Sequence, residues 1–386
     1  MNTQLNRSLS YWEVDTFFRQ TDVLVIGAGI VGINAALTIK RARPSWNIKV
    51  VDRGAIPAGA STRNAGFACF GSPTEILDDL SQQSESEVFE TVERRYRGLL
   101  ALKKELGEEI LQYVPCGGSE VFSAEEVNTY QACLDQLSFL NQRVRAITGL
   151  SETYYADPNR LAKQGMPGFS YLIQNRAEGG IHPGSMMQAL LQKAQSIGIS
   201  FLFGTSIESL GVEKDRVRVR TAHFGEMQVE RVLVANNGFS QGLLPELQVH
   251  GVRNQVWVSA PISQLKMRGC FHYDRGYFYF RNIGNRILIG GGRHLDRLGE
   301  TTTGFGESQI IQSALQKLLQ EKILPPELGL PRIDYQWSGI LGVGTGKKPI
   351  IRNLDDRLVV AVRLGGMGVA IGTLVGQDAG NLVVQS

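Results

Sequence analysis

The sequence contains little of what disulfide-rich and metal-binding proteins require. Its four cysteines lie far apart along the chain, at Cys69, Cys116, Cys133 and Cys270. They form no Cys-x-x-Cys pair, which argues against a disulfide framework and a metal site and is typical of a reducing compartment. The histidines are scattered in the same way, so we expect no bound metal.

The sequence also lacks an excess of charge and a long hydrophobic run. Lys and Arg number 40 and Asp and Glu 37, for a formal net charge of +3. The basic residues do not cluster, so neither nucleic acid nor an anionic membrane surface is an expected partner. The most apolar stretch, residues 23–39, is interrupted by glycines and is too short to span a bilayer. Because no signal-peptide pattern opens the sequence, we expect a cytoplasmic protein without a transmembrane segment.

Glycine and hydrophobic residues are abundant. The 386 residues include 44 glycines, and 42% of residues are hydrophobic against 20% charged. This composition predicts a large core with many tight turns, as in nucleotide-binding α/β proteins. The length suggests roughly two or three domains.

A glycine-rich turn is the strongest motif. Residues 22–26 form an apolar run that predicts a strand buried on both faces of a parallel sheet. The turn Gly27–Gly32, with the sequence GAGIVG, opens a predicted helix over 30–43, and a second buried strand over 48–51 ends at Asp52. Together these segments predict one Rossmann-type βαβ unit.

Each part of this unit suits the binding of a dinucleotide. The first glycine permits the tight turn, the second lets the backbone approach a pyrophosphate, and the third allows close packing of helix and strand. The phosphates would lie at the helix N-terminus, and Asp52, about 20 residues after the turn, would accept hydrogen bonds from ribose hydroxyls. NAD and FAD both remain possible at this point. The small and hydroxyl residues of Ala60–Gly66, with the sequence ASTRNAG, favour FAD, since they would reach a diphosphate and an isoalloxazine edge.

The remaining pattern indicates two interleaved domains in an α/β fold. We predict a Rossmann-type FAD-binding domain from residues 1–75, 179–248 and 335–386. An α+β substrate domain, built on a mixed sheet, is predicted from residues 76–178 and 249–334.

Six landmarks occur in order along nearly the whole chain. They are Gly27–Gly32 with Asp52, Ala60–Gly66, Gly180–Pro183, Val252–Gln255, Trp337–Gly339 and Gly366–Gly368. In this order they resemble the D-amino acid oxidase superfamily of FAD enzymes, especially its glycine oxidase, sarcosine oxidase and D-amino acid dehydrogenase branches.

The resemblance implies a set of residues that contact FAD. They are Gly27, Gly29, Ile30, Val31, Gly32, Asp52, Arg53, Ala60, Ser61, Thr62, Asn64, Ala65, Gly66, Ile207, Asn236, Gly339, Gly366, Met367, Gly368 and Val369. Some relatives attach FAD through a cysteine near the C-terminus, which this chain lacks, so we expect noncovalent FAD. The turn Gly365–Gly368 precedes a final helix whose N–H groups would face the flavin N1/C2=O edge, where reduced flavin is anionic.

The residues expected to surround the substrate differ from those of these relatives. Leu341 and Gly366 stand where the glycine oxidase branch has arginines for the substrate carboxylate. Leu288 stands where sarcosine oxidases have a lysine for oxygen activation. These differences put in doubt an α-amino-acid carboxylate substrate and efficient use of oxygen.

Four residues are candidates for the substrate pocket: Phe278, Tyr279, Arg281 and Arg363. Arg281 and Arg363 could replace the missing arginines. In a regular strand Tyr277 and Tyr279 point away from Phe278 and Phe280, so one pair would pack in the core and the other would form a wall over the flavin. The family pattern favours Phe278 for that wall.

We therefore expect an FAD-dependent oxidoreductase acting on a small amine or amino acid. It would oxidise a C–N bond by hydride transfer to flavin N5, and water would hydrolyse the imine. The electron acceptor would be oxygen, a quinone or a carrier protein. The alternative is a dehydrogenase of a hydroxy acid or other carbon donor that uses a quinone or carrier-protein acceptor. A third possibility is a flavin-binding regulatory protein without turnover.

Overall fold

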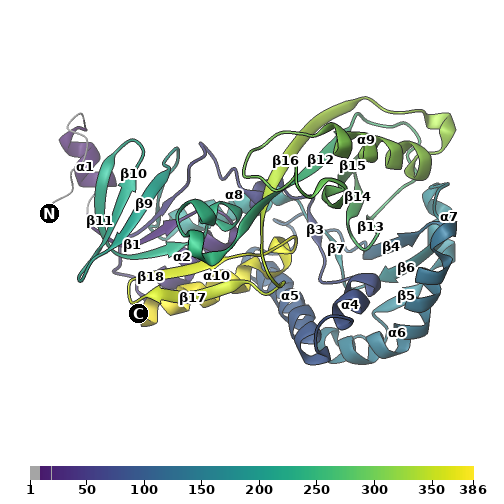
Figure 1. The fold of residues 1–386 in the computed structure, drawn as a ribbon, viewed down its shortest axis with the longest axis horizontal. Helices are drawn as coiled ribbons and strands as arrows, with labels where there is room; N and C mark the ends of the chain where they lie inside the picture. Colours follow the sequence, from purple (N-terminus) through teal and green to yellow (C-terminus); the bar gives the residue numbers. More distant parts are fainter. Residues whose placement is uncertain (1–8, 19) are drawn as a thin grey trace.

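The computed structural model describes residues 9–18 and 20–386. The molecule is elongated, with two eight-stranded sheets placed side by side along its length (Figure 1). A two-stranded sheet of β3 (Phe67–Ala68) and β7 (Gly179–Gly180) completes the set. One face of the second sheet is turned toward the first half of the molecule, which is the half that contains the first sheet.

The first sheet has the order β17-β18-β11-β1-β2-β8, with β10 attached to β11 and β9 to β10. Strand β1 is parallel to β2 and β11, and β11 is parallel to β18. Val23, Leu24 and Val25 of β1 are fully buried, as a strand covered on both faces requires. The strands are β1 (Thr21–Ile26), β2 (Ile48–Val51), β8 (Ser200–Leu202), β9 (Ile207–Val212), β10 (Val217–Thr221), β11 (Gly225–Val234), β17 (Ile350–Asp355) and β18 (Leu358–Val362).

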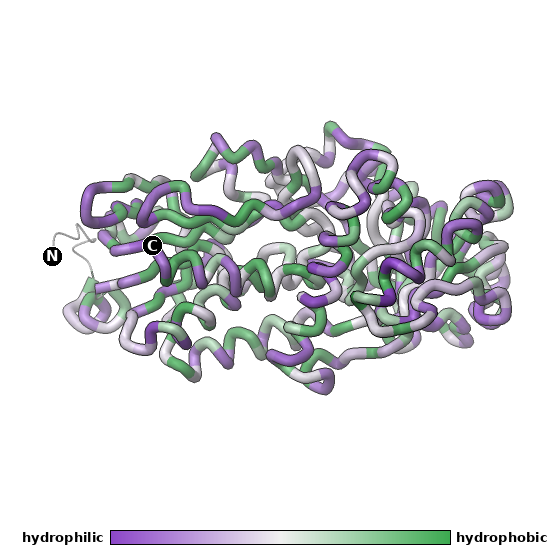
Figure 2. The backbone as a smooth tube through the Cα atoms, turned by 90° about the horizontal axis from the view of Figure 1, so that it is seen from below, coloured by the Kyte–Doolittle hydropathy of each residue, from purple (hydrophilic) through white to green (hydrophobic). Residues whose placement is uncertain are grey.

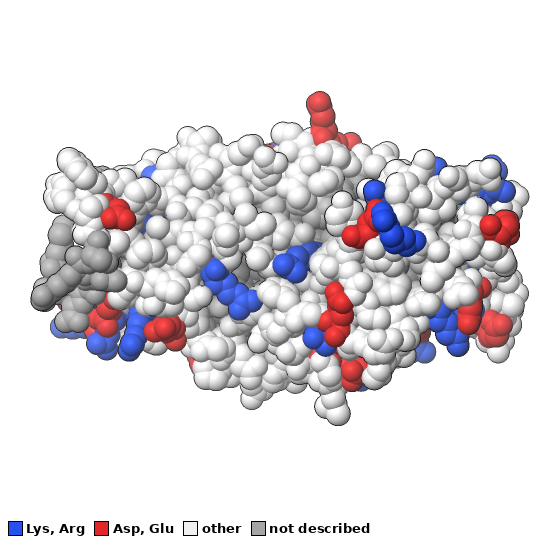
Figure 3. Space-filling model, turned by 90° about the horizontal axis from the view of Figure 1, so that it is seen from above, with Lys and Arg blue, Asp and Glu red and all other residues white. Residues whose placement is uncertain are grey.

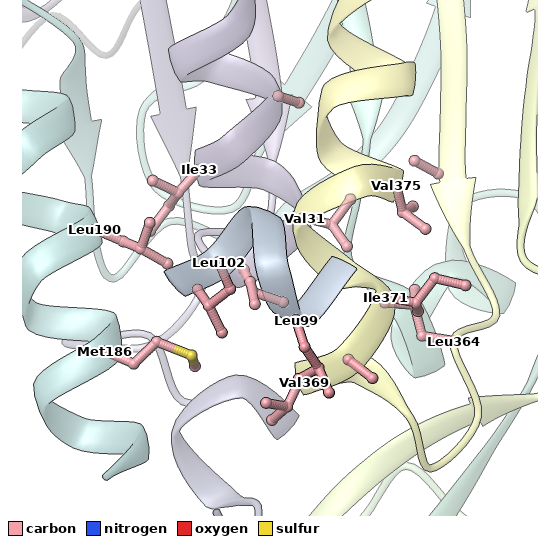
Figure 4. Packing of buried hydrophobic residues seen from close by; sticks show 14 of the residues in the cluster. Val31, Ile33, Leu99, Leu102, Met186, Leu190, Leu364, Val369, Ile371 and Val375 are labelled. Carbon is pink, nitrogen blue, oxygen red and sulfur yellow. The ribbon is translucent and has the colours of Figure 1, made fainter. Parts of the chain in front are cut away.

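Four helices pack together on one face of this sheet: α2 (Ile30–Ala42), α5 (Glu85–Leu106), α8 (Pro183–Ser196) and α10 (Gly368–Gln385). Figure 4 shows their apolar side chains, among them Val31, Leu99, Met186 and Ile371, gathered into one cluster. The approach of α10 to α2 depends on Gly376, because a Cβ there would lie 2.6 Å from the carbonyl oxygen of Val31.

The second sheet has the order β16-β12-β15-β14-β13-β4-β6-β5. Strands β13 and β4 are parallel and the other pairs antiparallel, which confirms the expected mixed sheet. The strands are β4 (Gly118–Phe122), β5 (Tyr154–Ala156), β6 (Tyr171–Asn175), β12 (His250–Ser259), β13 (Cys270–Tyr273), β14 (Phe278–Ile283), β15 (Arg286–Gly291) and β16 (Ile333–Val343).

A separate core lies against the face of the second sheet that is turned away from the first half. Phe280 and Trp257 of the sheet pack there with Leu315 of α9 (Gln309–Leu318) and Leu161 of α7 (Pro158–Gln164). The remaining helices are α1 (Tyr11–Phe17), α3 (Ala60–Arg63), α4 (Pro73–Leu80) and α6 (Val127–Thr148).

The structure moves two expected domain boundaries. Strand β16 pairs with β12 along its length, so the chain leaves the second sheet after Val343 rather than before residue 335. Helix α5 was expected in the substrate domain, yet it packs on α10, and a Cβ at Gly98 would lie 2.0 Å from the carbonyl oxygen of Ala370. Both differences arise from long-range packing.

Hydrophobic segments run through the interior of both halves, and hydrophilic ones are frequent in the outer loops (Figure 2). Within residues 9–18 and 20–386, no helix is long and apolar enough to cross a membrane.

Candidate active site between the two sheets

Two connected cavities lie between the sheets. The inner cavity, of about 390 Å³, follows the carboxyl ends of β1 and β2, and the outer cavity, of about 470 Å³, lies against the second sheet. The residues that line both are Ala60, Asn64, Leu341, Leu364, Gly365, Gly366 and Val369. One face of the molecule is hollowed near its middle, with basic side chains at the rim (Figure 3).

The glycine turn shapes the inner cavity as its sequence predicts. Gly27 has a φ of +110°, a conformation that residues with a Cβ rarely adopt. A Cβ at Gly32 would lie 1.9 Å from the carbonyl oxygen of Gly27, so this glycine permits the close packing of turn and helix. The amide of Ile30 donates to Ser61 Oγ at 3.0 Å, which joins the turn to the ASTRNAG segment.

Asp52 lies at the end of β2 and faces the turn. Its Oδ2 accepts from the amide of Ala28 at 3.0 Å and its Oδ1 from the amide of Gly54 at 2.9 Å. Burial raises the pKa of Asp52, and these two N–H groups offset the shift only in part. Arg53 stacks on the ring of Phe239, 3.6 Å from its centroid. The carboxyl group of Asp52 and the stacked pair Arg53 and Phe239 therefore line one end of the inner cavity.

The inner cavity fits a dinucleotide. Asn236 Oδ1 is buried at its wall and has no hydrogen-bond partner in the described part of the chain. At Gly59, Gly365 and Gly366 an added Cβ would enter open space at the cavity wall. A buried acceptor beside bare backbone suits the hydroxyls and phosphates of a nucleotide.

Most of the expected FAD-contacting residues line these cavities. Those at the inner cavity are Gly27, Gly29, Ile30, Val31, Asp52, Arg53, Ala60, Ser61, Asn64, Ile207, Asn236, Gly366, Gly368 and Val369. Ala65, Gly339 and Met367 line the outer one.

Three expected residues line neither cavity: Gly32, Thr62 and Gly66. Gly32 packs on the turn, as described above. Thr62 Oγ1 donates to the carbonyl oxygen of Pro57, and Gly66, with φ of +76°, is packed against Ile181. The structure gives these three residues packing roles behind the cavity wall.

A row of side chains on the second sheet forms the wall of the outer cavity. Register places Val256, Gly290, Tyr279 and His272 side by side across β12, β15, β14 and β13. A Cβ at Gly290 would meet the Tyr279 ring, so this glycine lets the ring lean across β15. The Tyr279 hydroxyl thereby reaches Asn254, whose Nδ2 donates to it at 3.1 Å.

The four candidates for the substrate pocket fall in different places. Tyr279 and Arg363 line the outer cavity. Phe278 does not, because strand alternation places it in the core with Phe280, so the choice of Phe278 for the flavin wall is corrected to Tyr279. Arg281 does not line it either, since its Nη1 donates to the carbonyl oxygens of Gly66 at 2.5 Å and Ile181 at 3.0 Å.

Most of the cationic side chains around the outer cavity already have partners. Arg95 pairs with Glu75 at 3.0 Å, and Lys347 reaches Asp79 at 2.5 Å. Arg363 donates through Nε and Nη1 to the carbonyl oxygens of Lys348 and Thr345, so it holds the loop between β16 and β17. Arg63 donates to the carbonyl oxygen of Ser338, and Arg275 lies 3.9 Å from Asp78.

Arg293 differs from these residues. It lines the outer cavity and is half-buried, and no hydrogen bond or ion pair joins its side chain to residues 9–18 or 20–386. Its charge acts on Tyr279: burial raises the pKa of the phenol far above its ordinary value, and Arg293 opposes that shift.

Two more features define the chemistry of the outer cavity. Asn254 Oδ1 is buried there without a partner in the described residues, so it is an acceptor with free capacity. Burial lowers the pKa of His272 to about 4, which keeps its imidazole neutral at neutral pH. Leu288, which stands in the place of the lysine, packs with Val256 and Val258 beneath Ala65.

Sequence reasoning missed Asn254, His272 and Arg293 as cavity residues, and at the inner cavity it missed Met186 and Phe239. Asn254 falls within one of the ordered landmarks, so its place in the sequence carried a signal. No feature of the sequence around Arg293 identifies it, because whether an arginine lacks a partner is decided only in the folded chain.

A parallel βαβ sheet with a glycine turn, opening onto one cavity that suits a dinucleotide and a second cavity beside it, is the arrangement of a dinucleotide-binding protein. Comparisons with known proteins make this specific. The family model described as FAD-dependent oxidoreductase matches residues 22–382, so the chain belongs to this family and is an enzyme of that class.

Individual relatives are distant. The chain is 22% identical to a probable oxidoreductase OrdL of Rhizobium meliloti (strain 1021) over 93% of this chain and 82% of the relative. Glycine oxidase from Bacillus cereus ATCC 14579 has a similar structure, with a TM-score of 0.73, 17% identity and 95% of each chain covered. L-proline dehydrogenase from P. horikoshii has a TM-score of 0.72 at 18% identity, covering 95% of this chain and 94% of the other. At such identities these structures share the fold.

Proposed function

We propose that this protein oxidises the C–N bond of an amino acid or N-substituted amino acid, using noncovalently bound FAD. One observation carries the proposal. The wall of the outer cavity carries an acceptor with free capacity, Asn254 Oδ1, and a cation, Arg293, whose side chain has no partner in the described residues; Asn254 bonds to the Tyr279 hydroxyl and the charge of Arg293 acts on it. The pair is complementary to a substrate that has both an N–H and a carboxylate.

The chain's own residues would bind and orient this substrate. Arg293 would hold the carboxylate, and Asn254 Oδ1 would accept the amine N–H. The residues of the inner cavity, among them Asp52 and Ser61, would hold FAD, which would supply the hydride acceptor for oxidation of the substrate carbon; the imine product would hydrolyse in water. Positioning and exclusion of water therefore account for most of what the protein contributes.

The cysteine at the outer cavity supports noncovalent binding. Cys69 lines this cavity, and burial, with the nearby carboxylates of Glu178 and Glu75, raises the pKa of its thiol well above the ordinary value. A neutral thiol is a poor nucleophile. Release of intact FAD on denaturation is the expected outcome.

The names of several structural relatives agree with an amine substrate. They include glycine oxidase, L-proline dehydrogenase and iminodiacetate oxidase. All three names describe substrates that carry an amine and a carboxylate. Leu288 in place of the lysine favours a quinone or carrier protein over oxygen as the electron acceptor.

An anaerobic titration of the holoenzyme tests the proposal. Amino acids, N-methyl amino acids, amines and hydroxy acids are added separately, and flavin absorbance is recorded. We expect bleaching by at least one compound with both an amine and a carboxylate, with ammonia or an amine released. Bleaching by hydroxy acids alone would instead support the alternative dehydrogenase. A flavin that dithionite reduces and no compound of the panel does would contradict the proposal.

A further inference from the structure

Two cysteines that are far apart in the sequence are neighbours in the fold. The sulfur atoms of Cys116 and Cys270 lie 3.7 Å apart, and neither residue is in a disulfide. Cys270 opens β13 and faces Gly118 of the parallel strand β4, and Cys116 lies two residues before Gly118. The sheet topology therefore brings together two cysteines that lie 154 residues apart in the sequence.

The surroundings of the two thiols are cationic. Arg281 is the cross-strand partner of Cys270, and Arg160 donates to the carbonyl oxygen of Cys116 at 2.8 Å. A hydrogen bond with Cys270 lowers the pKa of Cys116 to about 6, and the charges of Arg281 and Arg160 add to the shift against the effect of burial. Cys116 is thus the more acidic thiol of the pair, and its thiolate is the form that reacts with oxidants.

The two cysteines differ in accessibility. Cys116 is half-buried, whereas Cys270 is buried, with 2% of its surface exposed. An oxidant in solution therefore reaches Cys116 first, and Cys270 lies within reach to complete the reaction. We propose that Cys116 and Cys270 are a redox-active dithiol, which hydrogen peroxide converts reversibly to a disulfide.

The reaction balances with one peroxide. The Cys116 thiolate attacks a peroxide oxygen, the O–O bond breaks, and a sulfenic acid and water form after uptake of a proton. The Cys270 thiol then attacks the sulfenic sulfur, the S–S bond forms, and a second water leaves. Two thiols are oxidised and one peroxide is reduced to two waters. The oxidant is hydrogen peroxide from solution, so the reaction requires no turnover of the enzyme.

The bond requires a small movement. A disulfide has a sulfur separation of about 2.05 Å, so the sulfurs must approach from 3.7 Å. Cys116 lies in the segment before β4, next to Gly117, which has a φ of +71°. Cys116 lies outside any strand, whereas Cys270 belongs to the central strand β13.

The site is linked to the outer cavity and to the end of the ASTRNAG segment. Arg281, the partner of Cys270, holds the carbonyl oxygen of Gly66 at the end of the ASTRNAG segment. His272, two residues after Cys270 on the same face of β13, lines the outer cavity. Formation of the disulfide would therefore act on residues that support the bound cofactor and the cavity wall.

The test uses the FAD-loaded full-length protein. It is treated with stoichiometric hydrogen peroxide, denatured, alkylated and digested for mass spectrometry, while free thiols are counted separately. We expect the count to fall from four to about two, with one cross-linked pair of peptides that contains Cys116 and Cys270, and dithiothreitol to restore four. Four thiols remaining, or oxidation spread evenly over all cysteines, would overturn the proposal.

Single variants identify the role of each thiol. In Cys270→Ser, Cys116 is expected to stop at the sulfenic acid, which dimedone traps, and in Cys116→Ser the other thiols are expected to survive the same treatment. Cys133→Ser is the matched control, because burial raises the pKa of Cys133 to about 12 and it should not take part. Should a variant fold poorly, the peptide analysis of the wild-type protein decides alone. A disulfide that forms in Cys116→Ser would contradict the assignment. The outcome is independent of the substrate, so it stands or falls separately from the proposed function.

Discussion

The inner and outer cavities are built in different ways. Three short motifs supply much of the inner cavity wall: Gly27, Gly29, Ile30 and Val31 come from the first, Ala60, Ser61 and Asn64 from the second, and Gly365, Gly366 and Gly368 from the third. The outer cavity takes Asn254, Tyr279, Arg293 and Lys347 each from a different element or loop. A cofactor site can therefore be encoded locally, whereas this substrate site depends on where distant segments meet.

The difference follows from what each ligand recognises. Phosphates bind to backbone N–H groups at a helix N-terminus, and a glycine turn supplies these wherever it occurs. A small substrate binds to side chains, and a side chain is available only if the fold leaves it without a partner. Arg281 and Arg293 illustrate this point, since both are arginines of the second sheet region but only Arg293 has no partner in the described chain.

The largest effect is expected where the local motif is broken. In Gly32→Ala the new Cβ would lie 1.9 Å from the carbonyl oxygen of Gly27, a clash that costs about 3 kcal/mol or more. We expect near-complete loss of bound FAD or of soluble protein, measured as the ratio of flavin to protein. Gly211→Ala on β9 is the control, because its Cβ would meet only Arg218, at 3.6 Å. Normal flavin content in Gly32→Ala would contradict the claim that a local motif encodes the cofactor site.

A smaller effect is expected when Arg293 loses its charge. Arg293→Gln should lower kcat/KM for an amino acid substrate about 100-fold, since a charge-assisted hydrogen bond is worth up to about 3 kcal/mol. FAD content should stay normal. The amine that lacks the carboxylate should be oxidised equally by variant and wild type, which separates anion binding from general damage.

Arg297→Gln is the matched control for this substitution. Arg297 ends the same 3₁₀ turn, over Arg293–Asp296, but its side chain is exposed. Its kinetics should match the wild type. Equal losses in the two variants would show that charge near the rim, and not a specific contact, is responsible.

An effect of a different kind is expected in how stability depends on pH. Burial raises the pKa of Glu178 to about 8, even though its Oε1 accepts from the amides of Phe70 and Gly71. Because this folded pKa is above the unfolded value of about 4.5, the contribution of Glu178 is complete below pH 4.5 and is lost as the pH rises toward 8. Between these values it lowers stability by about 1 kcal/mol per pH unit.

Glu178→Gln tests this dependence, since glutamine does not titrate and keeps an oxygen for the two amides. Urea unfolding at a series of pH values from 5 to 8 should give a flatter stability curve than the wild type. An unchanged slope would mean that Glu178 is ionised in the folded protein. Glu152→Gln, at an exposed ion pair with Arg176, should leave the slope as it is.

The elements that sequence reasoning located well are those with a strong local pattern. The strands expected over residues 22–26 and 48–51 are β1 and β2, and the helix expected over 30–43 is α2, which ends one residue earlier. For the wall over the flavin, strand alternation narrowed the candidates to one of two pairs, Tyr277 with Tyr279 or Phe278 with Phe280. The choice between the pairs depended on which face of the sheet the second core covers, and α9 supplies that core.

By itself the sequence determined the βαβ unit, the glycine turn and the dinucleotide it suits, because those rest on backbone geometry and on residues close together in the chain. Only the tertiary structure decided that β16 joins the second sheet and that Cys116 meets Cys270. It also decided that Arg281 and Arg363 are occupied while Arg293 and Asn254 have free capacity at the cavity. The physical reason is that a polar group's availability is set by every segment packed around it, and such contacts have no local signature in the sequence.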